Sequence, residues 1–219
     1  MAGRMRIAIP LAALLATGGC SGTPEPDVYV PPEPVPFPSM AFSGQGVALF
    51  PVTLMVAEEE LGWGDMLRPR EEGLHTADSI IATFLTERVP EVEWILPEEL
   101  RRAAARAPGM LPDPDHMGTA VLRAQGMDRV PDPLISELRN LTAVAGNRWA
   151  AVPASLVFLQ VHDDETGEET EGVGRAELTV VMVDVRRNQV PFRSVASGEG
   201  EDPWTALWNA LKTLVPDLP

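Results

Sequence analysis

The sequence predicts an α/β (α+β) domain of two layers, in which helices cover a mixed sheet that ends in an antiparallel three-strand meander. Three observations predict it. The run Leu178–Val185 is apolar on both alternating faces, as in a strand at the centre of a covered sheet. Short strand-like runs alternate with helical stripes before it, and the clearest amphipathic helix of the chain follows it. The expected order is β-α-β-α-α-β-β-β-α.

The first half of the globular part alternates strands and helices. Gly46–Val56 is a β-branched and aromatic run, which predicts a buried strand with Pro51 marking a bulge or an edge. The polar, acidic stretch Glu58–Glu72 predicts a surface loop. Thr76 is placed to cap a helix that Pro90 ends. The apolar positions of this helix are Ile80, Ile81, Phe84 and Leu85.

A short strand is expected at Val92–Leu96, directly before a second helix. That helix has Pro97 at its first position, acidic residues in its first turn and arginines toward its end, an order that suits the helix dipole, and Gly109 ends it. Met110–Val130 has no clear period and predicts neither a helix nor a strand. A third helix is expected over Asp132–Gly146, which starts with a capping aspartate followed by proline.

The C-terminal part predicts the three strands of the meander at Trp149–His162, Ala176–Arg187 and Val190–Ala196. Asp163–Gly174 would form the hairpin loop between the first two. The final helix starts at Asp202-Pro203, and its two tryptophans are expected to seal one face of the sheet. Its apolar positions are Trp204, Leu207, Trp208, Leu211, Leu214 and Val215.

The amino-acid composition excludes several classes of protein. Of 219 residues, 45% are apolar, which fills a hydrophobic core and excludes a disordered chain. The formal charge of −15 becomes −17 once residues 1–19, which hold two arginines, are removed. So acidic a surface repels phosphate backbones and argues against nucleic-acid binding. Cys20 is the only cysteine, which excludes an internal disulfide and a thiolate metal cluster.

The N-terminus has the plan of a secretory signal. Two arginines precede the apolar run Ile7–Thr17, which is too short to span a bilayer, and two glycines then precede Cys20. The pattern resembles the lipobox of bacterial lipoproteins, with Thr17 where a leucine is usual. The alternatives are an ordinary signal peptide with a coincidental cysteine, and a soluble secreted protein without lipid.

The lipobox resemblance implies a lipid anchor and a location in the cell. Residues 1–19 would be the lipoprotein signal peptide, and Cys20 would be diacylated (palmitate-type modification) and become the new N-terminus. Ser21, not aspartate, follows the cysteine, which resembles an outer-membrane sorting signal. We therefore expect a lipid-anchored protein of the cell envelope, on the inner leaflet of the outer membrane and facing the periplasm.

A proline-rich stretch follows the cysteine. Thr23–Ser39 contains seven prolines and has no helical or strand period. Such a segment extends as polyproline II at about 3.1 Å per residue, so it could hold a domain up to ~60 Å from the membrane. The alternative is a ligand for a proline-recognising partner. The sequence thus divides into residues 1–19, a tether over 20–41 and a single domain over 42–219.

Residue types that could hold a metal occur in two places. Asp113-x-Asp115-His116 and His162–Glu165 combine histidine with carboxylates, but neither has the spacing of a known metal motif, and we expect solvated loops. His75 stands apart from both. The acidic run Asp163–Glu171 lacks the spacing of a calcium loop. We expect no metal and no cofactor.

Signals for catalysis are also weak. The chain has no G-x-S-x-G elbow and no glycine-rich phosphate loop, because Gly44-Gln45-Gly46 precedes a strand. Ser155 and His162 are seven residues apart on one expected strand, which places them on opposite faces. Asp184 could be a functional carboxylate at a strand end. We expect it instead to pair with Arg186 or Arg187, or to accept hydrogen bonds from amides of the turn.

The order of elements resembles a domain shared by three groups of envelope proteins. These are curli-secretion-type lipoproteins, lipoprotein activators of penicillin-binding proteins, and the N-terminal domain of the Tol-system propeller protein. The matching stretches cover roughly Gly46 to Pro216: GVALFPV, LRNLTAVAGNRWAAVPASL, VVMVDVRRNQVPFRSVASGEG and PWTALWNALKTLVPDL. No pair of alternating, aromatic-girdled segments and no propeller repeats are present, so neither a ring-forming pore nor the whole Tol-like role is expected.

The resemblance implies a non-enzymatic interaction or scaffold module with an envelope protein as partner. It would work through its sheet edge, its loops or Met110–Val130. The alternative is a periplasmic hydrolase that acts on envelope glycan through paired carboxylates, because Asp and Glu are abundant and sequence does not show which of them lie close together.

Overall fold

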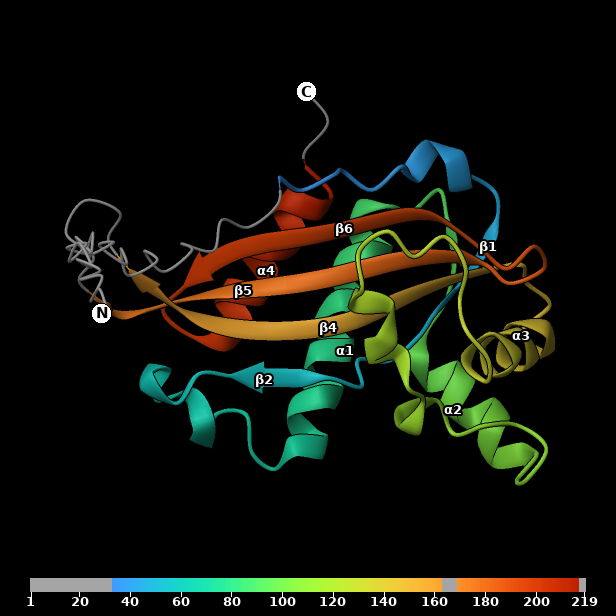
Figure 1. Cartoon of the computed structure of the whole chain (residues 1–219), viewed down its shortest axis with the longest axis horizontal. Helices are drawn as coiled ribbons and strands as arrows, with labels where there is room; N and C mark the ends of the chain where they lie inside the picture. The colour runs from blue at the N-terminus through green and yellow to red at the C-terminus, as the bar shows by residue number, and fades with distance from the viewer. Residues whose placement is uncertain (1–32, 163–168, 217–219) are drawn as a thin grey trace, which may run out of the picture. The chain divides into compact units, whose positions relative to one another are not determined.

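A computed structural model describes residues 33–162 and 169–216 (Figure 1). Their centre is a six-stranded mixed sheet in the order β3-β1-β4-β5-β6, with β2 also paired to β4. The helices are α1 (Arg70–Arg88), α2 (Pro97–Arg106), α3 (Leu134–Val144) and α4 (Pro203–Leu214), and the strands are β1 (Gly46–Leu49), β2 (Met55–Ala57), β3 (Glu93–Ile95), β4 (Trp149–His162), β5 (Glu169–Asp184) and β6 (Gln189–Gly200). The predicted fold class, with its antiparallel C-terminal meander, is confirmed.

Strand β5 is buried on both faces, as its sequence predicts. On one face Leu178, Val180 and Met182 join the core under helices α1 and α4. On the other face Val181 and Val183 join a second core, beneath α2, α3 and the 3-10 turn η5 (Thr119–Arg123). Burying a single such side chain contributes about 1.5–3 kcal/mol, so this strand holds both cores together.

The first predicted strand is two strands in the structure. Strands β1 and β2 both run parallel to β4, and they are separated by Phe50–Leu54. Pro51 has no backbone N–H to give to a ladder, so pairing breaks there. The amide of Val52 instead donates a hydrogen bond of 2.8 Å to Asp78 Oδ1 on α1.

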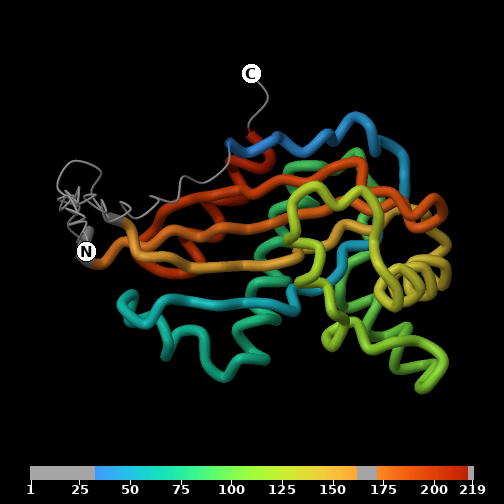
Figure 2. Tube along the Cα trace, in the orientation of Figure 1, coloured from blue at the N-terminus to red at the C-terminus, as the bar shows by residue number. Residues whose placement is uncertain are grey.

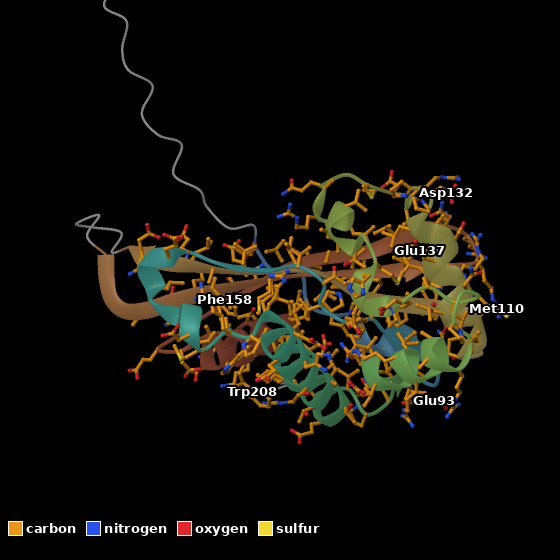
Figure 3. The ribbon with its side chains drawn as sticks, turned by 90° about the horizontal axis from the view of Figure 1, so that it is seen from below. Glu93, Met110, Asp132, Glu137, Phe158 and Trp208 are labelled. Carbon is orange, nitrogen blue, oxygen red and sulfur yellow. The ribbon has the colours of Figure 1, made fainter. Side chains whose placement is uncertain are left out.

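Helix α1 begins at Arg70, and the prediction that Thr76 caps it was wrong. Thr76 lies inside the helix, where its hydroxyl donates to the carbonyl of Glu72 at 2.8 Å. Two glutamates in the first turn suit the N-terminal end of the helix dipole, which allows the helix to begin earlier. The expected surface loop is therefore shorter, and within it Trp63 is buried against Phe158, with ring centroids 5.6 Å apart. Phe158 is labelled in Figure 3.

Two of the three meander strands, β5 and β6, are longer than predicted. Strand β5 already begins at Glu169 and pairs with the end of β4, so the expected hairpin loop is shorter. Its residues 163–168 lie outside the described residues. Strand β6 continues past Ala196 to Gly200 because α4 packs closely over its last residues. A Cβ on Gly198 would lie 2.1 Å from the backbone nitrogen of Ala210.

The tryptophans of α4 pack against the core on this sheet face but are only half-buried, so the prediction that they seal the face is met in part. Trp208, labelled in Figure 3, packs edge-on against Phe84 of α1, with ring centroids 5.0 Å apart. The sheet face under α4 is covered by smaller side chains, which the close approach of the helix requires. They are Ala206, Leu207, Ala210, Leu211 and Leu214.

The end of the proline-rich stretch packs on the domain. Figures 1 and 2 show it running beside β6. The amide of Val35 donates to Ser194 Oγ at 3.0 Å, the amide of Phe37 donates to the carbonyl of Leu214 at 2.7 Å, and the Phe37 ring lies 5.7 Å from that of Phe192. Val35 and Phe37, which the sequence analysis placed in the tether, therefore belong to the packed domain.

Two side chains of α4 donate hydrogen bonds to backbone carbonyls of β6. Asn209 Nδ2 donates to the carbonyl of Glu199 at 2.7 Å, and Thr213 Oγ1 donates to that of Ser197 at 3.1 Å. Unpaired groups on an outer strand favour pairing with other chains, so these contacts protect the strand. In residues 33–162 and 169–216, no helix combines the length and the apolarity needed to cross a membrane.

Candidate functional site

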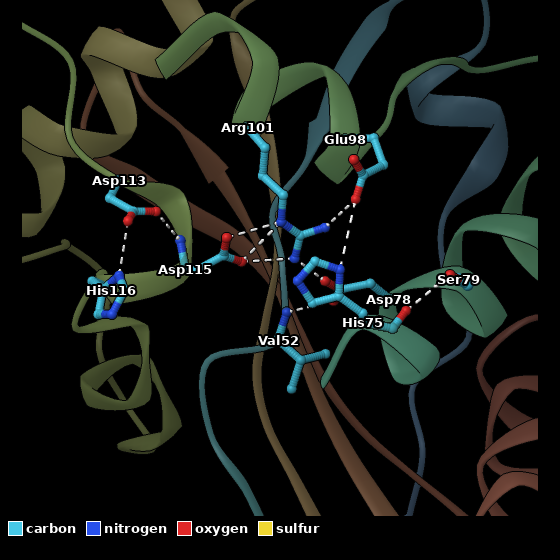
Figure 4. Close-up of polar contacts among 9 residues, drawn as sticks. All are labelled: Val52, His75, Asp78, Ser79, Glu98, Arg101, Asp113, Asp115 and His116. Atoms are coloured by element: carbon cyan, nitrogen blue, oxygen red, sulfur yellow. Dashed lines mark hydrogen bonds and ion pairs between the residues drawn. The ribbon is translucent and has the colours of Figure 1, made fainter. Parts of the chain in front are cut away.

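A cluster of charged side chains lies where α1, α2 and the 3-10 turn η4 (Pro114–His116) meet (Figure 4). Arg101 of α2 is at its centre. Its Nε and Nη2 donate to the carboxylate of Asp115 at 2.7–3.0 Å, and its Nη1 donates to Glu98 Oε1 at 2.8 Å. Its Nη2 also pairs with Asp78 Oδ2. One guanidinium therefore binds three carboxylates.

Asp78 connects this cluster to the sheet. Its side chain is only 5% exposed, and its Oδ1 accepts the hydrogen bond from the amide of Val52 between β1 and β2. The Asp78 carboxylate thus joins the β1–β2 connection to α1, and Arg101 joins α1 to α2 and to Asp115 of η4. A buried charge of this kind is tolerated when it is paired and hydrogen-bonded, as here.

Burial sets the protonation behaviour of the pair. Loss of water raises the pKa of Asp78 to about 6, although the amide of Val52 and the guanidinium of Arg101 lower it. For Arg101, burial acts to lower the pKa, but the hydrogen bonds to Asp115 and Asp78 outweigh it and hold the pKa above its usual value. At neutral pH the pair is therefore ionised, and Asp78 is the member that takes up a proton on acidification.

The predicted Asp113-x-Asp115-His116 group is divided between two roles. Asp115 binds Arg101, whereas Asp113 accepts the backbone amide of Asp115 at 3.1 Å and contacts His116 Nδ1 at 2.9 Å. The amide of Asp115 lowers the pKa of Asp113. Among the residues that the structure describes, no three His, Cys, Asp or Glu side chains come together in a way that could hold a metal.

Cavities lie on both sides of the cluster. One of about 430 Å³ is lined by Asp78, Arg101 and the start of α2, and one of about 570 Å³ is lined by Asp115, His116 and the first turns of α1. His75 stands near the cluster, with its Nδ1 3.9 Å from Glu98 Oε1. The cluster thus forms the wall between two surface hollows.

Asp184 forms a turn and pairs with Arg187, as predicted, with Arg187 Nε 4.0 Å from Asp184 Oδ2, and it has a second ion-pair partner that the sequence did not indicate. Its Oδ1 accepts the amides of Arg186 and Arg187 at 3.1 and 3.2 Å. Its Oδ2 pairs with Arg148 just before β4, because Trp149 and Asp184 are opposite each other in the antiparallel register. The hydrogen bond from Arg148 lowers the pKa of Asp184. The Arg148 guanidinium lies 4.7 Å from the centre of the Trp149 ring, a cation–π contact.

Of the other sequence candidates, the structure describes the side chain of Ser155, which takes no part in the described contacts of the cluster. Cys20 and residues 163–168 lie outside the described residues, and so do the side chains of His162 and residues 169–171. Ser155 is buried, and its hydroxyl donates to Thr179 Oγ1 at 3.2 Å.

Sequence reasoning missed Asp78 and the pairing of Arg101 with carboxylates. Asp78 follows Ala77 on the buried stripe of α1, and a charged residue between buried apolar positions was the signal available.

Comparisons with known proteins do not place the chain in a family. No protein-family model matches it, and no curated protein matches it in sequence. Among solved structures it is similar to the PelC dodecamer from Paraburkholderia phytofirmans (12% identity, TM-score 0.37, covering 85% of this chain and 96% of that chain). It is also similar to lipoprotein GNA1162 from Neisseria meningitidis (12%, 0.34, 71% and 83%) and to the LpoB C-terminal domain from Salmonella enterica (10%, 0.31, 72% and 82%). At such values the likeness carries no conclusion about function or assembly.

The raised pKa of Asp78 predicts how its replacement depends on pH. Between pH 4 and 6 folded Asp78 (pKa about 6) binds a proton that the unfolded chain (pKa about 3.9) has lost, so wild-type stability falls as pH rises. Asp78→Asn removes this titration. Its free energy of unfolding relative to wild type is expected to rise by about 2 kcal/mol from pH 4 to pH 7. Urea unfolding at pH 4, 5, 6 and 7 measures it.

Asp113→Asn is the control for that series. Because the folded-state pKa of Asp113 is lowered, its ionised form contributes stability that is present above the unfolded pKa and lost as pH falls through the folded one. Because the range from pH 4 to pH 7 lies above both of these pKa values, the relative stability of this variant is expected to stay nearly constant there and to change only below about pH 4, in the opposite direction. A pH-independent difference for Asp78→Asn would contradict the assigned titration.

Proposed function

We propose that the chain is a lipid-anchored, non-enzymatic interaction module of the bacterial cell envelope, held at the outer membrane through Cys20 and facing the periplasm. One observation carries the proposal. A signal-like apolar run, the only cysteine of the chain and a proline-rich stretch follow one another and lead directly into the folded domain. The several acyl chains of a lipoprotein anchor are enough for stable membrane attachment, because each buried methylene contributes about 0.8 kcal/mol.

The geometry of the charged cluster supports binding over catalysis. A general acid or base must exchange a proton with a substrate atom within hydrogen-bond reach. Both oxygens of Asp78 already accept hydrogen bonds, from the amide of Val52 and from Arg101, and the carboxylate is nearly buried. Asp115 is bound by the same guanidinium. The cluster therefore acts as a joint that holds α1, α2 and η4 in place and shapes the surface hollows beside it.

The second candidate is a periplasmic hydrolase that acts on envelope glycan. One observation favours it: Asp78, with a pKa of about 6, lines a cavity of about 430 Å³ and shares Arg101 with a second carboxylate. Incubation of the purified protein with peptidoglycan separates the two. Soluble fragments that disappear in Asp78→Asn and Asp115→Asn would establish the hydrolase, and no release by the wild type would support the module.

Replacing Cys20 by serine is expected to move the protein from the membrane fraction to the soluble fraction of cells. The thiol is the only group in the chain that can form the thioether of a lipoprotein anchor. Fractionation, together with incorporation of an alkyne-tagged fatty acid, measures the change. Ser21→Ala is the matched control and should remain in the membrane and labelled. Unchanged membrane association of Cys20→Ser would overturn the proposed anchor.

A further inference from the structure

Three cavities adjoin along the outer face of helix α1. The cavity of about 430 Å³ beside α2 shares Ser79 and Thr83 with one of about 390 Å³ that Trp208 also lines. This second cavity shares His75 with the cavity of about 570 Å³ beside η4. The shared residues place the three cavities next to one another along α1, and we call this row of hollows, which runs from Glu71 to Glu87, the α1 groove. At 1.5 Å per helical residue its length is about 24 Å.

The floor of the α1 groove includes two small side chains, Ser79 and Thr86, whose hydroxyl protons are already used. Ser79 and Thr86 donate their hydroxyl protons to helix carbonyls of His75 and Ala82, at 2.8 and 2.7 Å. Their oxygens can therefore accept hydrogen bonds from a ligand but have no proton to donate. Apolar surface flanks this floor on both sides. It comes from Ile80, Leu96 and Trp208, which are half-buried.

The charge of the α1 groove is strongly negative. Six carboxylates line it: Glu71, Asp78, Glu87, Glu98, Asp113 and Asp115. Its two arginines are both engaged inside the domain. Arg101 binds three of the carboxylates, and Arg70 donates to the carbonyls of Met55 and Thr53 at 2.8 and 3.2 Å. The described contacts pair neither arginine with Glu71 or Glu87, so acceptors and negative charge are what the groove offers.

We propose that the α1 groove binds a basic segment of a partner protein, one that carries lysine or arginine side chains next to apolar ones. This inference rests on the proposed function as an interaction module and names the surface and the chemistry of its partner. Lysine and arginine supply only donors and positive charge, which is the complement of a wall of carboxylates and acceptor hydroxyls. The apolar flanks would cover the stems of these side chains.

Size and charge select this occupant over others. A groove of about 24 Å matches roughly 16 residues of helix or seven of extended chain, which is longer than a single small ligand. The carboxylates repel nucleic acid and anionic lipid headgroups. A second copy of this chain, with a formal charge of −15 and one lysine, is repelled as well.

Site-specific photocrosslinking in intact cells tests the proposal on the full-length protein. Benzoylphenylalanine replaces Thr83, an exposed residue of the groove, or Asn140, an exposed residue of α3 on the opposite face of the sheet, as the control. Adducts are expected from position 83 and not from position 140. Mass spectrometry of the trypsin-digested adduct should identify a peptide from a protein segment with net positive charge.

Charge reversal gives a second readout in the same strain. The pair Glu71→Lys and Glu87→Lys is expected to lower the adduct yield at position 83 at least about tenfold, since the groove then repels a basic segment. Asp128→Lys is the control, because Asp128 is exposed and does not line the groove. This variant should leave the adduct yield at position 83 unchanged.

Several results would overturn the proposal. In the crosslinking experiment, these are the absence of an adduct at position 83, equal adduct yields from positions 83 and 140, an adduct with lipid or with a second copy of this chain, and an adduct peptide that is acidic or uncharged. In the charge-reversal experiment, it is an adduct yield that the two substitutions do not alter. Adducts at position 140 alone would overturn the groove and leave the interaction module standing. Failure of the Cys20→Ser test would instead overturn the anchor and leave the groove untouched.

Discussion

Replacing Gly198 by alanine is expected to lower the free energy of unfolding by about 3 kcal/mol, the upper end of what overpacking costs. The added Cβ would lie 2.1 Å from the backbone nitrogen of Ala210 and 2.3 Å from the carbonyl carbon of Asn209. Both atoms belong to the backbone of α4, so no side-chain rotation relieves the clash. The helix must move away from β6, and the buried Leu207 and Leu211 lose contacts with the sheet.

Thermal and urea unfolding of the two proteins measure this effect. For a chain of this length, 3 kcal/mol corresponds to a melting temperature lower by roughly 10 °C. Gly64→Ala is the matched control, because a Cβ there meets no atom within 4 Å. It is expected to be neutral or slightly stabilising. Equal losses for the two variants would show that α4 does not require glycine at position 198.

Replacing Arg101 by methionine is expected to cost about 3–5 kcal/mol of stability at pH 7.5, because it leaves the nearly buried Asp78 without its counter-charge. The loss depends on pH with a definite sign. Without the guanidinium, the folded-state pKa of Asp78 rises further above its unfolded value. The destabilisation is therefore smallest near pH 5, where Asp78 takes up a proton, and grows as pH rises.

Two further variants separate the ion pair from helix packing. Arg102→Met changes the adjacent residue of α2, which is exposed and donates only to the carbonyl of Glu98, so a change within about 0.5 kcal/mol is expected. Adding Asp78→Asn to Arg101→Met should restore part of the lost stability, since the unpaired carboxylate is removed. Urea unfolding at pH 5 and 7.5 measures all four proteins. A loss in Arg101→Met that is independent of pH would contradict the role of Asp78.

Local signals in the sequence predicted several elements closely. Strand β4 has the predicted bounds, Trp149–His162. Helix α4 begins after the predicted cap, where the Asp202 side chain accepts the amides of Trp204 and Thr205 at 2.9 and 3.0 Å. Alternation, capping and proline placement are properties of a few neighbouring residues, so the sequence alone is enough to read them.

Other features depended on partners distant in sequence. Thr76 was placed at a helix start because threonine favours that position, but the helix gains its earlier turns by packing against the sheet and the chain before it. Asp184 met Arg148, 36 residues away, because strand register brought them together. The candidate site was missed for the same reason, since Arg101 lies 23 residues from Asp78 and 14 from Asp115.

By itself, the sequence determined that this protein is a single acidic α/β chain whose central strand, Leu178–Val185, is apolar on both faces. The alternation of apolar residues depends only on neighbours along the chain, so it can be read without knowing how the other elements pack. Only the tertiary structure decided that three carboxylates share one arginine and that helix α1 presents a groove lined with acceptors. Those features arise from side chains of separate elements, and their spacing in space has no counterpart in their spacing along the chain.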